Sequence, residues 1–566
     1  CRIASFLPRN LQDGAVEMGP LVNLPVRTSN RRIGIFGWGV VAPGCPDVDS
    51  FRKRLADGGS WLEPFSDFGP SNFLVGNPSF DLEKYHGWID ERFPPSRFSQ
   101  LLSKMGQPTL YAVGAFIQAL DQNPGIEAAL QEMGSGAHVY VGTGLGDIPT
   151  ISRIALEADR AQRQWDAFWA DPERCPARAA HDAGDSPPEL SDQAPADPDQ
   201  LEDAAREEAR RIWNSFWAAH SSNLQEYLAS LREIENLSVE GEVEAGKSAV
   251  LREKMKRTAS LRKEWGTPPE PWASISSNVL WNIHSSPPTQ ISMMGKITGP
   301  CFAPVAACST FGVSLKLGID AIEREEAEAV VIGASDPAPC SLTVGAFSAA
   351  KVLSSDGRVS KPLTGLRGTH VSGGSCVWII GDLEKMRARG FQPLGMEPIS
   401  VGLTADADHI ITPSAEGPQK AISQAMASAG ASPTEIATWD LHCTATPGDY
   451  LEVENTRQIL HEDVLMTARK GTFGHGMGSC GGWELTAQMF SGEEGMVPPT
   501  DLGDQELNPE IARVHGNFVG DTASPLPEGY AGKLSMGVGG INACVISRPW
   551  SDSDLADSES TAAEQG

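Results

Sequence analysis

A cysteine at the junction of an apolar stretch and an amphipathic helix is the first residue in the sequence that could act as a nucleophile. Cys308 follows the apolar residues 304–307 and precedes the helical pattern of residues 309–318. A thiol in this position meets the positive end of the helix dipole and free N–H groups, and both favour the reactive thiolate. Because most buried cysteines are inert, Cys308 alone does not assign a function.

Two histidines at the ends of later predicted strands could complete such a site. His442 lies in the loop after the apolar residues 436–441, and His475 lies in a Gly-rich turn before a helix. A single histidine in such a position is most often structural. A thiolate with two imidazoles suits acyl chemistry, because one group attacks while the others stabilise or transfer charge. We therefore expect Cys308, His442 and His475 to share one cavity.

The segments around these residues resemble the β-ketoacyl synthases, the condensing enzymes of fatty acid and polyketide synthesis in the thiolase superfamily. Residues 441–449, LHCTATPGD, resemble the first histidine motif of that family, H-G-T-x-T-P-x-G-D. Residues 470–475, KGTFGH, resemble the second, K-x-x-x-G-H. Thiolases use a second cysteine where this sequence has His475, which favours the synthase branch. Further similar segments are 31–44, 297–312 around Cys308, 344–354, 361–368 and 535–546, so the resemblance covers about 31–150 and 271–550.

The resemblance implies a role for each matching residue. Cys308 would take an acyl group from a thioester. His442 and His475 would hydrogen-bond the thioester carbonyl of a malonyl-type extender, promote its decarboxylation and stabilise the enolate for a Claisen condensation. The other implied roles are a buried organising pair, Lys470 and Glu484; an oxyanion hole from the backbone N–H groups of Cys308 and Val538; and contacts of the phosphopantetheine arm, Thr444 and Thr446.

The resemblance also implies the class of protein and its partners. The chain is expected to be an acyltransferase of the β-ketoacyl synthase type, to form a homodimer, and to use acyl carrier protein or CoA thioesters. No metal and no tightly bound cofactor are implied.

Several positions depart from the family pattern. The gating loop, which normally carries phenylalanines, has Met536 and Val538 here. Cys443 replaces a usual Gly, and the first histidine motif is one residue short. His370 and Gly374 stand where the family has Phe and Glu. Since the nucleophile and both histidines are retained, these changes bear on the substrate more than on the reaction.

Composition excludes some functions and suggests a compartment. The 566 residues carry a formal charge of −28, which argues against sequence-independent binding to nucleic acid or to an anionic membrane surface. No run approaches the roughly 18 apolar residues of a membrane span, and the first residues lack the apolar core of a signal peptide. The ten cysteines are scattered without a C-x-x-C pair. A reducing, cytoplasmic setting is therefore expected. The chain begins with Cys1 rather than Met, so its true start is expected to be missing or processed.

Strands alternate with helices outside residues 152–270, which indicates an α/β fold. The resemblance implies a thiolase-like fold, with two pseudo-symmetric halves in an α-β-α-β-α arrangement. The expected parts are an N-terminal extension 1–30, a first half 31–390, a helical insertion 152–270 within it, a second half 391–550 and a disordered acidic tail 551–566.

The insertion carries two unusual patterns. Aromatic trios at Trp165/Phe168/Trp169 and Trp213/Phe216/Trp217 each lie on one helix face. They predict either two helices that pack together or the lining of a hydrophobic tunnel. Residues 247–265, which include Lys254, Lys256 and Arg257, have seven basic and two acidic side chains. This run is either a solvated helix face or a docking patch for an acidic partner.

Three functions fit the sequence. The first is a condensing enzyme that releases CO2. The second is an acyltransferase that passes the acyl group from Cys308 to an alcohol, an amine or a thiol without decarboxylation. The third is a non-catalytic partner subunit, which the retained Cys308, His442 and His475 disfavour.

Overall fold

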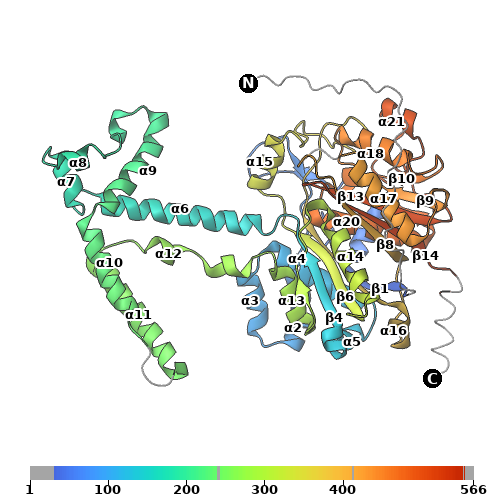
Figure 1. Cartoon of the computed structure of the whole chain (residues 1–566), viewed down its shortest axis with the longest axis horizontal. Helices are drawn as coiled ribbons and strands as arrows, with labels where there is room; N and C mark the ends of the chain where they lie inside the picture. Colours follow the sequence, from blue (N-terminus) through green and yellow to red (C-terminus); the bar gives the residue numbers. More distant parts are fainter. Residues whose placement is uncertain (1–30, 239–242, 411–413, 552–553, 555–566) are drawn as a thin grey trace. The chain divides into compact units, whose positions relative to one another are not determined.

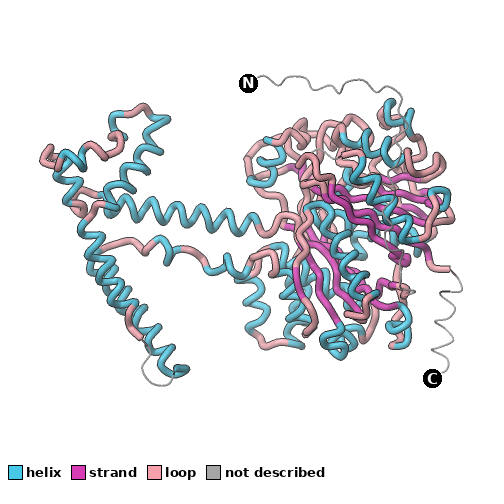
Figure 2. Tube along the Cα trace, viewed as in Figure 1, coloured by secondary structure: helices cyan, strands magenta, loops and turns pink. Residues whose placement is uncertain are grey.

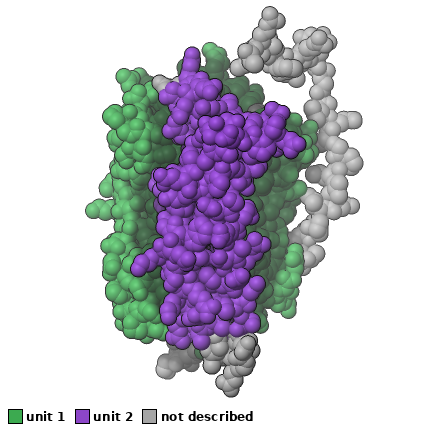
Figure 3. All heavy atoms as spheres, turned by 90° about the vertical axis from the view of Figure 1, so that its left-hand side faces the viewer, with its two compact units in different colours: residues 1–146, 284–566 green, residues 147–283 purple. Residues whose placement is uncertain are grey.

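The computed structural model describes residues 31–238, 243–410, 414–551 and 554. They form two compact units, one of residues up to 146 and from 284 onward, the other of residues 147–283 (Figure 3). The expected extension 1–30 and nearly all of the expected tail 551–566 lie outside the described residues.

The larger unit contains two sheets covered by helices (Figures 1 and 2). The first sheet has the strand order β1-β7-β6-β4-β5. The β5, β4 and β6 strands are parallel to one another, β7 is antiparallel to β6, and β1 is antiparallel to β7. The strands are β1 (Ile33–Val41), β4 (Ala137–Gly142), β5 (Cys301–Phe302), β6 (Ala329–Asp336) and β7 (Gly374–Asp382).

The second sheet repeats this pattern in the order β10-β9-β13-β14-β8. The β10, β9 and β13 strands are parallel to one another, β14 is antiparallel to β13, and β8 is antiparallel to β14. Each strand therefore has a topological equivalent in the first sheet, which confirms two pseudo-symmetric halves. The strands are β8 (Met396–Ala405), β9 (Ile436–Asp440), β10 (Leu465–Thr467), β13 (Tyr530–Gly537) and β14 (Ile541–Pro549).

The two sheets enclose a layer of helices, of which α14 (Thr310–Glu323) and α20 (Met477–Glu494) form the centre. One buried cluster joins Phe311 of α14 and Trp483 of α20 to both sheets, through Trp378 and Val545. Outside the sheets, α4 (Gln107–Asp121) packs on the first and α17 (Glu416–Ala429) on the second. The predicted α/β fold with α-β-α-β-α layers is confirmed.

Shorter elements complete the larger unit. They are α1 (Val48–Asp57), β2 (Glu63–Pro64), β3 (Leu74–Val75), α2 (His86–Arg92), α3 (Ser96–Lys104), α5 (Ile126–Met133), α13 (Ser286–Gly295), α15 (Ser341–Ala349), α16 (Leu383–Ala388), α18 (Gly448–Arg457), α19 (Lys470–Phe473), β11 (Met496–Val497), α21 (Pro509–Val514) and β12 (Ser524–Pro525).

The smaller unit has its own core, built around the aromatic trios. Trp165 and Trp169 pack against Tyr227, with ring centroids 5.7 and 5.4 Å apart, and Trp217 packs in an adjoining buried cluster. The helix-packing interpretation of the trios is therefore confirmed. The helices are α6 (Ile148–Ala170), α7 (Pro176–Asp182), α8 (Pro188–Ser191), α9 (Asp203–Ala219), α10 (Ser222–Glu235), α11 (Val243–Trp265) and α12 (Pro271–Ser274).

The search for membrane spans covers the described residues of both units. Among them, no helix has both the length and the apolar character needed to cross a bilayer. The nine cysteines in this part of the chain are free thiols.

Candidate active site

The nucleophile elbow lies between β5 and α14. Cys308 is in a short 3-10 turn that leads directly into α14, and the preceding Ala307 has a positive φ of 47°. Such a backbone conformation is strained for a residue with a side chain and often occurs at active sites. The hydroxyl of Ser309 donates to the carbonyl oxygens of Ser535 and Ile541, at 3.1 and 2.7 Å. The elbow is therefore fixed against the turn between β13 and β14.

That turn brings a second backbone donor to the thiol. A Cβ on Gly537 would lie 2.8 Å from the Ala306 carbonyl oxygen, so glycine permits the close approach. Burial raises the pKa of Cys308 to about 11, although the N–H of Val538, the Lys470 charge and the N–H of Cys308 act to lower it. These are the two N–H groups that are predicted to form the oxyanion hole. The backbone donors favour the thiolate, as the sequence predicts, but burial has the larger effect on the pKa.

His442 lies in a loop that two carboxylates on α18 hold in place. Glu452 accepts hydrogen bonds from the backbone N–H groups of His442 and Cys443. Asp449 accepts from the N–H groups of Thr444, Ala445 and Thr446. Burial raises the pKa of Asp449 to about 6 and that of Glu452 to about 7, against these hydrogen bonds.

His475 is held in the turn between α19 and α20. Its N–H donates to the His370 carbonyl oxygen at 2.7 Å, and its own carbonyl accepts from Ser372 N at 2.9 Å. The backbone N–H of Met477 donates to His475 Nδ1 at 3.1 Å. Because Nδ1 is an acceptor, the neutral ring carries its hydrogen on Nε2.

The structure brings the predicted trio together. One ligand atom each of Cys308, His442 and His475 lies within 4.8 Å of the others, and the imidazole centroids are 5.4 Å apart. The Lys470 ammonium is 3.5 Å from His442 Nδ1; since an ammonium can only donate, the His442 hydrogen is also on Nε2. Burial and then the Lys470 charge lower the pKa of His442 far below its ordinary value and that of His475 to about 3. Both rings are therefore neutral hydrogen-bond donors at physiological pH.

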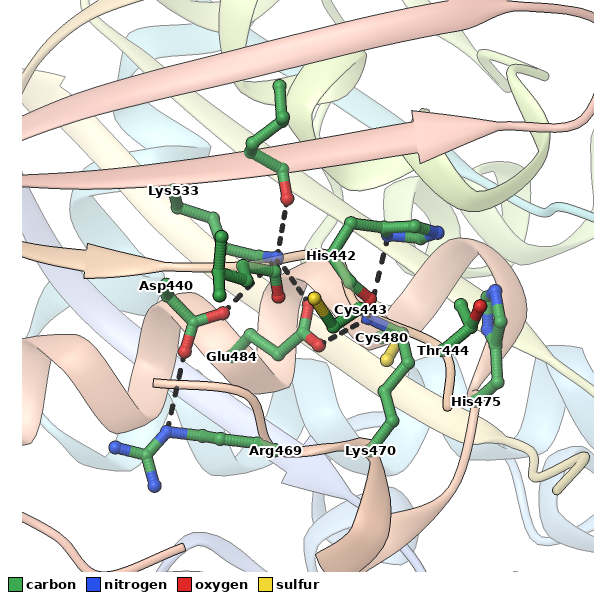
Figure 4. Close-up of polar contacts among 12 residues, drawn as sticks. Asp440, His442, Cys443, Thr444, Arg469, Lys470, His475, Cys480, Glu484 and Lys533 are labelled. Atoms are coloured by element: carbon green, nitrogen blue, oxygen red, sulfur yellow. Dashed lines mark hydrogen bonds and ion pairs between the residues drawn. The ribbon is translucent and has the colours of Figure 1, made fainter. Parts of the chain in front are cut away.

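The predicted organising pair is also close to the trio. Lys470 Nζ donates to Glu484 Oε1 at 2.6 Å and to the His442 carbonyl oxygen, and both side chains are 1% exposed (Figure 4). Lys470 thus links Glu484 on α20 to the His442 loop. Two residues that sequence reasoning did not assign, Asp440 and Lys533, join the same cluster.

A cavity of about 140 Å³ opens onto the trio. Its lining includes the predicted pantetheine contacts Thr444 and Thr446 and the predicted gate residues Met536 and Val538. Residues in the lining that sequence reasoning did not single out are Phe347, Val352, Thr369, Asp406, His409 and Asn542, the first two in the segment 344–354 that carried part of the family resemblance.

The trio also meets the distance requirement for holding a metal ion. The electrostatics oppose that use, however. The Lys470 ammonium next to His442 repels a cation. The geometry instead suits two donors that face a carbonyl oxygen next to a nucleophile.

Comparisons with known proteins agree with this geometry. Residues 254–385 match the family model "Beta-ketoacyl synthase, N-terminal domain", and residues 399–502 match "Beta-ketoacyl synthase, C-terminal domain". The 3-oxoacyl-[acyl-carrier-protein] synthase 2 of Vibrio harveyi is 30% identical over 269 residues, 45% of this chain and 63% of the relative. The enzyme of the same name from Rhizobium meliloti (strain 1021) is 28% identical over 271 residues, 46% of this chain and 63% of the relative. The matched part of the chain thus spans just under two thirds of the length of these relatives.

Solved structures share the fold. The ishigamide ketosynthase/chain length factor has a TM-score of 0.64 at 18% identity, covering 92% of this chain and 100% of that one. A β-ketoacyl synthase from Burkholderia phymatum STM815 has a TM-score of 0.62 at 17% identity, with the same coverage. A type II PKS acyl-carrier protein in complex with its ketosynthase has a TM-score of 0.58 at 16% identity, again covering 92% of this chain and 100% of that one. Both domain models match in order around the Cys308, His442 and His475 site, so this part of the chain is similar to the β-ketoacyl synthases in sequence as well as in fold.

Proposed function

We propose that the chain is a β-ketoacyl synthase that joins an acyl group to a malonyl-type thioester with loss of CO2, in fatty acid or polyketide-type biosynthesis. The observation that carries this proposal is the pair of neutral imidazoles, each with its Nε2–H available, within 4.8 Å of the Cys308 thiol. Two neutral donors can stabilise an enolate oxygen, which a single histidine paired with a thiolate does less well.

The first step is acyl loading. Cys308 Sγ attacks the carbonyl carbon of an acyl thioester, and the backbone N–H groups of Cys308 and Val538 stabilise the oxyanion. The new Sγ–C bond forms as the bond to the pantetheine sulfur breaks, and the thiol proton passes to that leaving sulfur. A pKa of about 11 means that this proton has to leave during the attack, not before it.

The second step is condensation. A malonyl thioester places its carbonyl oxygen between the Nε2–H groups of His442 and His475. The bond between the α-carbon and the carboxylate breaks, CO2 leaves, and the electron pair forms the enolate. The enolate carbon then attacks the acyl-Cys308 carbonyl, the C–S bond breaks, and the Cys308 sulfur takes a proton from solvent water. The product is a β-ketoacyl thioester.

Thr444 and Thr446 line the cavity, with their hydroxyl oxygens 3.0 Å apart, and are proposed to contact the pantetheine arm. At the gate, the Val538 side chain is 49% exposed and is smaller than the phenylalanine of the family pattern. A less bulky gate is expected to admit branched or bulky acyl groups.

Intact-protein mass spectrometry with acyl and malonyl thioesters tests the reaction. The wild type should gain the acyl mass and release CO2 from malonyl thioesters, and C308A should not gain the acyl mass. C340A is the matched control, because Cys340 is a partly exposed thiol outside the cavity lining. An acylated wild type that never releases CO2 contradicts the condensing function.

The second candidate function is acyl transfer from Cys308 to an alcohol, an amine or a thiol. The altered gate supports it, since Met536 and Val538 line the cavity where the family pattern has bulkier phenylalanines. This function predicts loss of the acyl mass on addition of an acceptor, with no CO2. A non-catalytic subunit would show neither acylation nor CO2.

We propose that no metal or tightly bound cofactor takes part, and that the substrates are carried on phosphopantetheine or CoA. The cation-repelling surroundings of His442 support this proposal. Treatment with a chelator should leave CO2 release unchanged, and addition of Zn²⁺ should not raise it.

We propose an acyl carrier protein as the partner and α11 as its docking surface. On α11, Arg252, Lys256 and Lys263 are exposed, as are Leu251 (52%) and Met255 (73%). In contrast, Lys254 pairs with Glu235 and Arg257 with Glu253. The basic and apolar face suits an acidic helix with apolar residues. The solved complex of a ketosynthase with its acyl-carrier protein supports a partner of this class.

Charge reversal tests the docking surface. R252E/K256E should raise the apparent KM for a malonyl carrier protein about tenfold and leave the KM for malonyl-CoA unchanged. R210E/R211E on α9 is the control with the same charge change. Equal effects of both variants contradict the proposal. A homodimer is proposed as well, and light scattering after size exclusion measures it.

A further inference from the structure

A second buried lysine lies behind the predicted Lys470–Glu484 pair. Lys533 Nζ is 2.8 Å from Glu484 Oε2 and 3.2 Å from Asp440 Oδ1, so Glu484 has one lysine at each carboxylate oxygen (Figure 4). Asp440 in turn has Arg469 Nε at 3.5 Å from its other oxygen. Lys533 also donates to the carbonyl oxygens of Leu441 and Leu534, at 3.3 and 2.7 Å. All of these charged side chains are 1–2% exposed.

The cluster has one more cation than it has carboxylates. Arg469, Lys470 and Lys533 are the cations, and Asp440 and Glu484 are the carboxylates, among the described residues. Burial opposes the charged form of Lys533, but Glu484 and Asp440 together raise its pKa above the ordinary value. Lys533 therefore stays charged, and without it the cluster would be neutral.

This excess charge is next to the two imidazoles. Burial is the largest cause of their lowered pKa values, and the charges of both Lys470 and Lys533 lower them further. The titratable and charged groups around the two rings are Cys308, Asp336, Asp440, Cys443, Asp449, Glu452, Arg469, Lys470, Cys480, Glu484 and Lys533. Of these, Asp449 and Glu452 are held by backbone N–H groups of the His442 loop.

We propose that Lys533, paired with Glu484 and Asp440, is a positioning residue that holds Glu484 against Lys470 and extends the pH range over which His442 and His475 stay uncharged. It acts in two ways. It fixes the second oxygen of Glu484, which leaves the first oxygen directed at Lys470 and, through it, at the His442 loop. It also supplies the positive charge that makes protonation of either imidazole unfavourable. Lys533 is absent from the cavity lining, so it touches no substrate. This role rests on the proposed function of the two histidines.

Variants that change the charge of the cluster test the proposal. K533M removes the excess positive charge of the cluster, and D440N increases that charge by one. The double variant D440N/K533M has the same net charge as the wild type. One buried charge acting at an effective dielectric of about 20 shifts a nearby pKa by about one unit. From a starting value of about 3 for His475, K533M should lose about half of its CO2 release, relative to wild type, between pH 7 and pH 4. K533R and D440N/K533M should follow the wild-type profile, and KM should stay within about twofold in all variants.

The assay holds the enzyme at pH 7 and mixes it with malonyl thioester at each pH for a few seconds. If K533M does not fold, D440N and D440N/K533M give the same comparison, because these two variants differ in Lys533 alone. The profile of D440N/K533M should then lie about one unit above that of D440N. A purely structural role would lower the melting temperature and leave the shape of every profile unchanged, which would overturn the proposal.

A second measurement does not depend on the reaction. NMR of [13Cε1]-histidine protein, with H442N and H475N for assignment, reports the protonation of each ring directly. The proposal expects the His475 signal of K533M to titrate about one pH unit higher than in wild type. Identical titrations in the two proteins overturn it. Should no protein release CO2, the proposed function fails, while the NMR titration still decides the role of Lys533.

Discussion

His475 should couple the stability of the larger unit to pH. Its pKa is about 3 in the folded protein, chiefly because of burial, against about 6.5 for an ordinary histidine. The unfolded chain therefore binds a proton below pH 6.5 that the folded chain does not. The stabilising contribution is fully present above pH 6.5 and is lost as the pH falls toward 3. At about 1.4 kcal/mol per pH unit, the loss between pH 6.5 and pH 4 is about 3 kcal/mol.

The substitution H475N removes this titration and keeps a polar side chain of similar size. The free energy of unfolding of the wild type, relative to H475N, should therefore fall by about 3 kcal/mol from pH 7 to pH 4. Other groups such as Asp449 and Glu452 titrate in both proteins, so they cancel in the difference. The loss of the Met477 N–H hydrogen bond lowers the stability of the variant equally at each pH.

Hydrogen exchange detected by mass spectrometry suits this test, because peptides from α20 report on the larger unit alone. H220N is the matched control, since His220 is an exposed histidine of the smaller unit. Parallel pH curves for the wild type and H475N would refute the reasoning, because they would mean that His475 is not a buried, uncharged imidazole in the folded protein.

Three further predictions concern neighbouring residues. Because the pKa of Cys308 is about 11, the rate of its alkylation by iodoacetamide, measured by mass spectrometry, should rise about tenfold per pH unit from pH 7 to pH 9. A rate that levels off below pH 8 would contradict this. Burial raises the pKa of Glu452 from 4.5 to about 7, so its stabilising contribution is present below pH 4.5 and is lost as the pH rises to 7. The free energy of unfolding of E452Q, measured by hydrogen exchange of α18 peptides, should therefore rise by about 3 kcal/mol relative to wild type between pH 4.5 and pH 7. An unchanged difference would argue against a buried carboxyl. His370 Nε2 accepts from Ser360 N at 2.8 Å, so H370F should cost about 1–3 kcal/mol by calorimetry without loss of acyl loading.

The sequence predicts the residues whose function depends on a local motif. Cys308, His442 and His475 could be found because each lies in a recognisable segment of the sequence. Asp440 and Lys533 could not, since they are 93 positions apart in the sequence and meet only through the parallel register of β9 and β13, where they are direct partners. No local pattern encodes that register. The high pKa of the Cys308 thiol could not be predicted for a related reason, because its depth of burial depends on segments distant in the sequence.

The repeated topology explains why the nucleophile and a histidine meet. In the first half, β5 leads through the elbow into α14; in the second, β10 leads through α19 into α20. Cys308 and His475 thus occupy equivalent places, each just before a central helix. A helix N-terminus disfavours a positively charged imidazole and favours an oxyanion. The helix N-terminus therefore has a different effect in each half. Before α20 it helps to keep His475 neutral, and before α14 it provides the N–H group that faces the Cys308 thiol. His442 does not precede a central helix. Lys470, which is paired with Glu484, supplies the positive charge next to it instead.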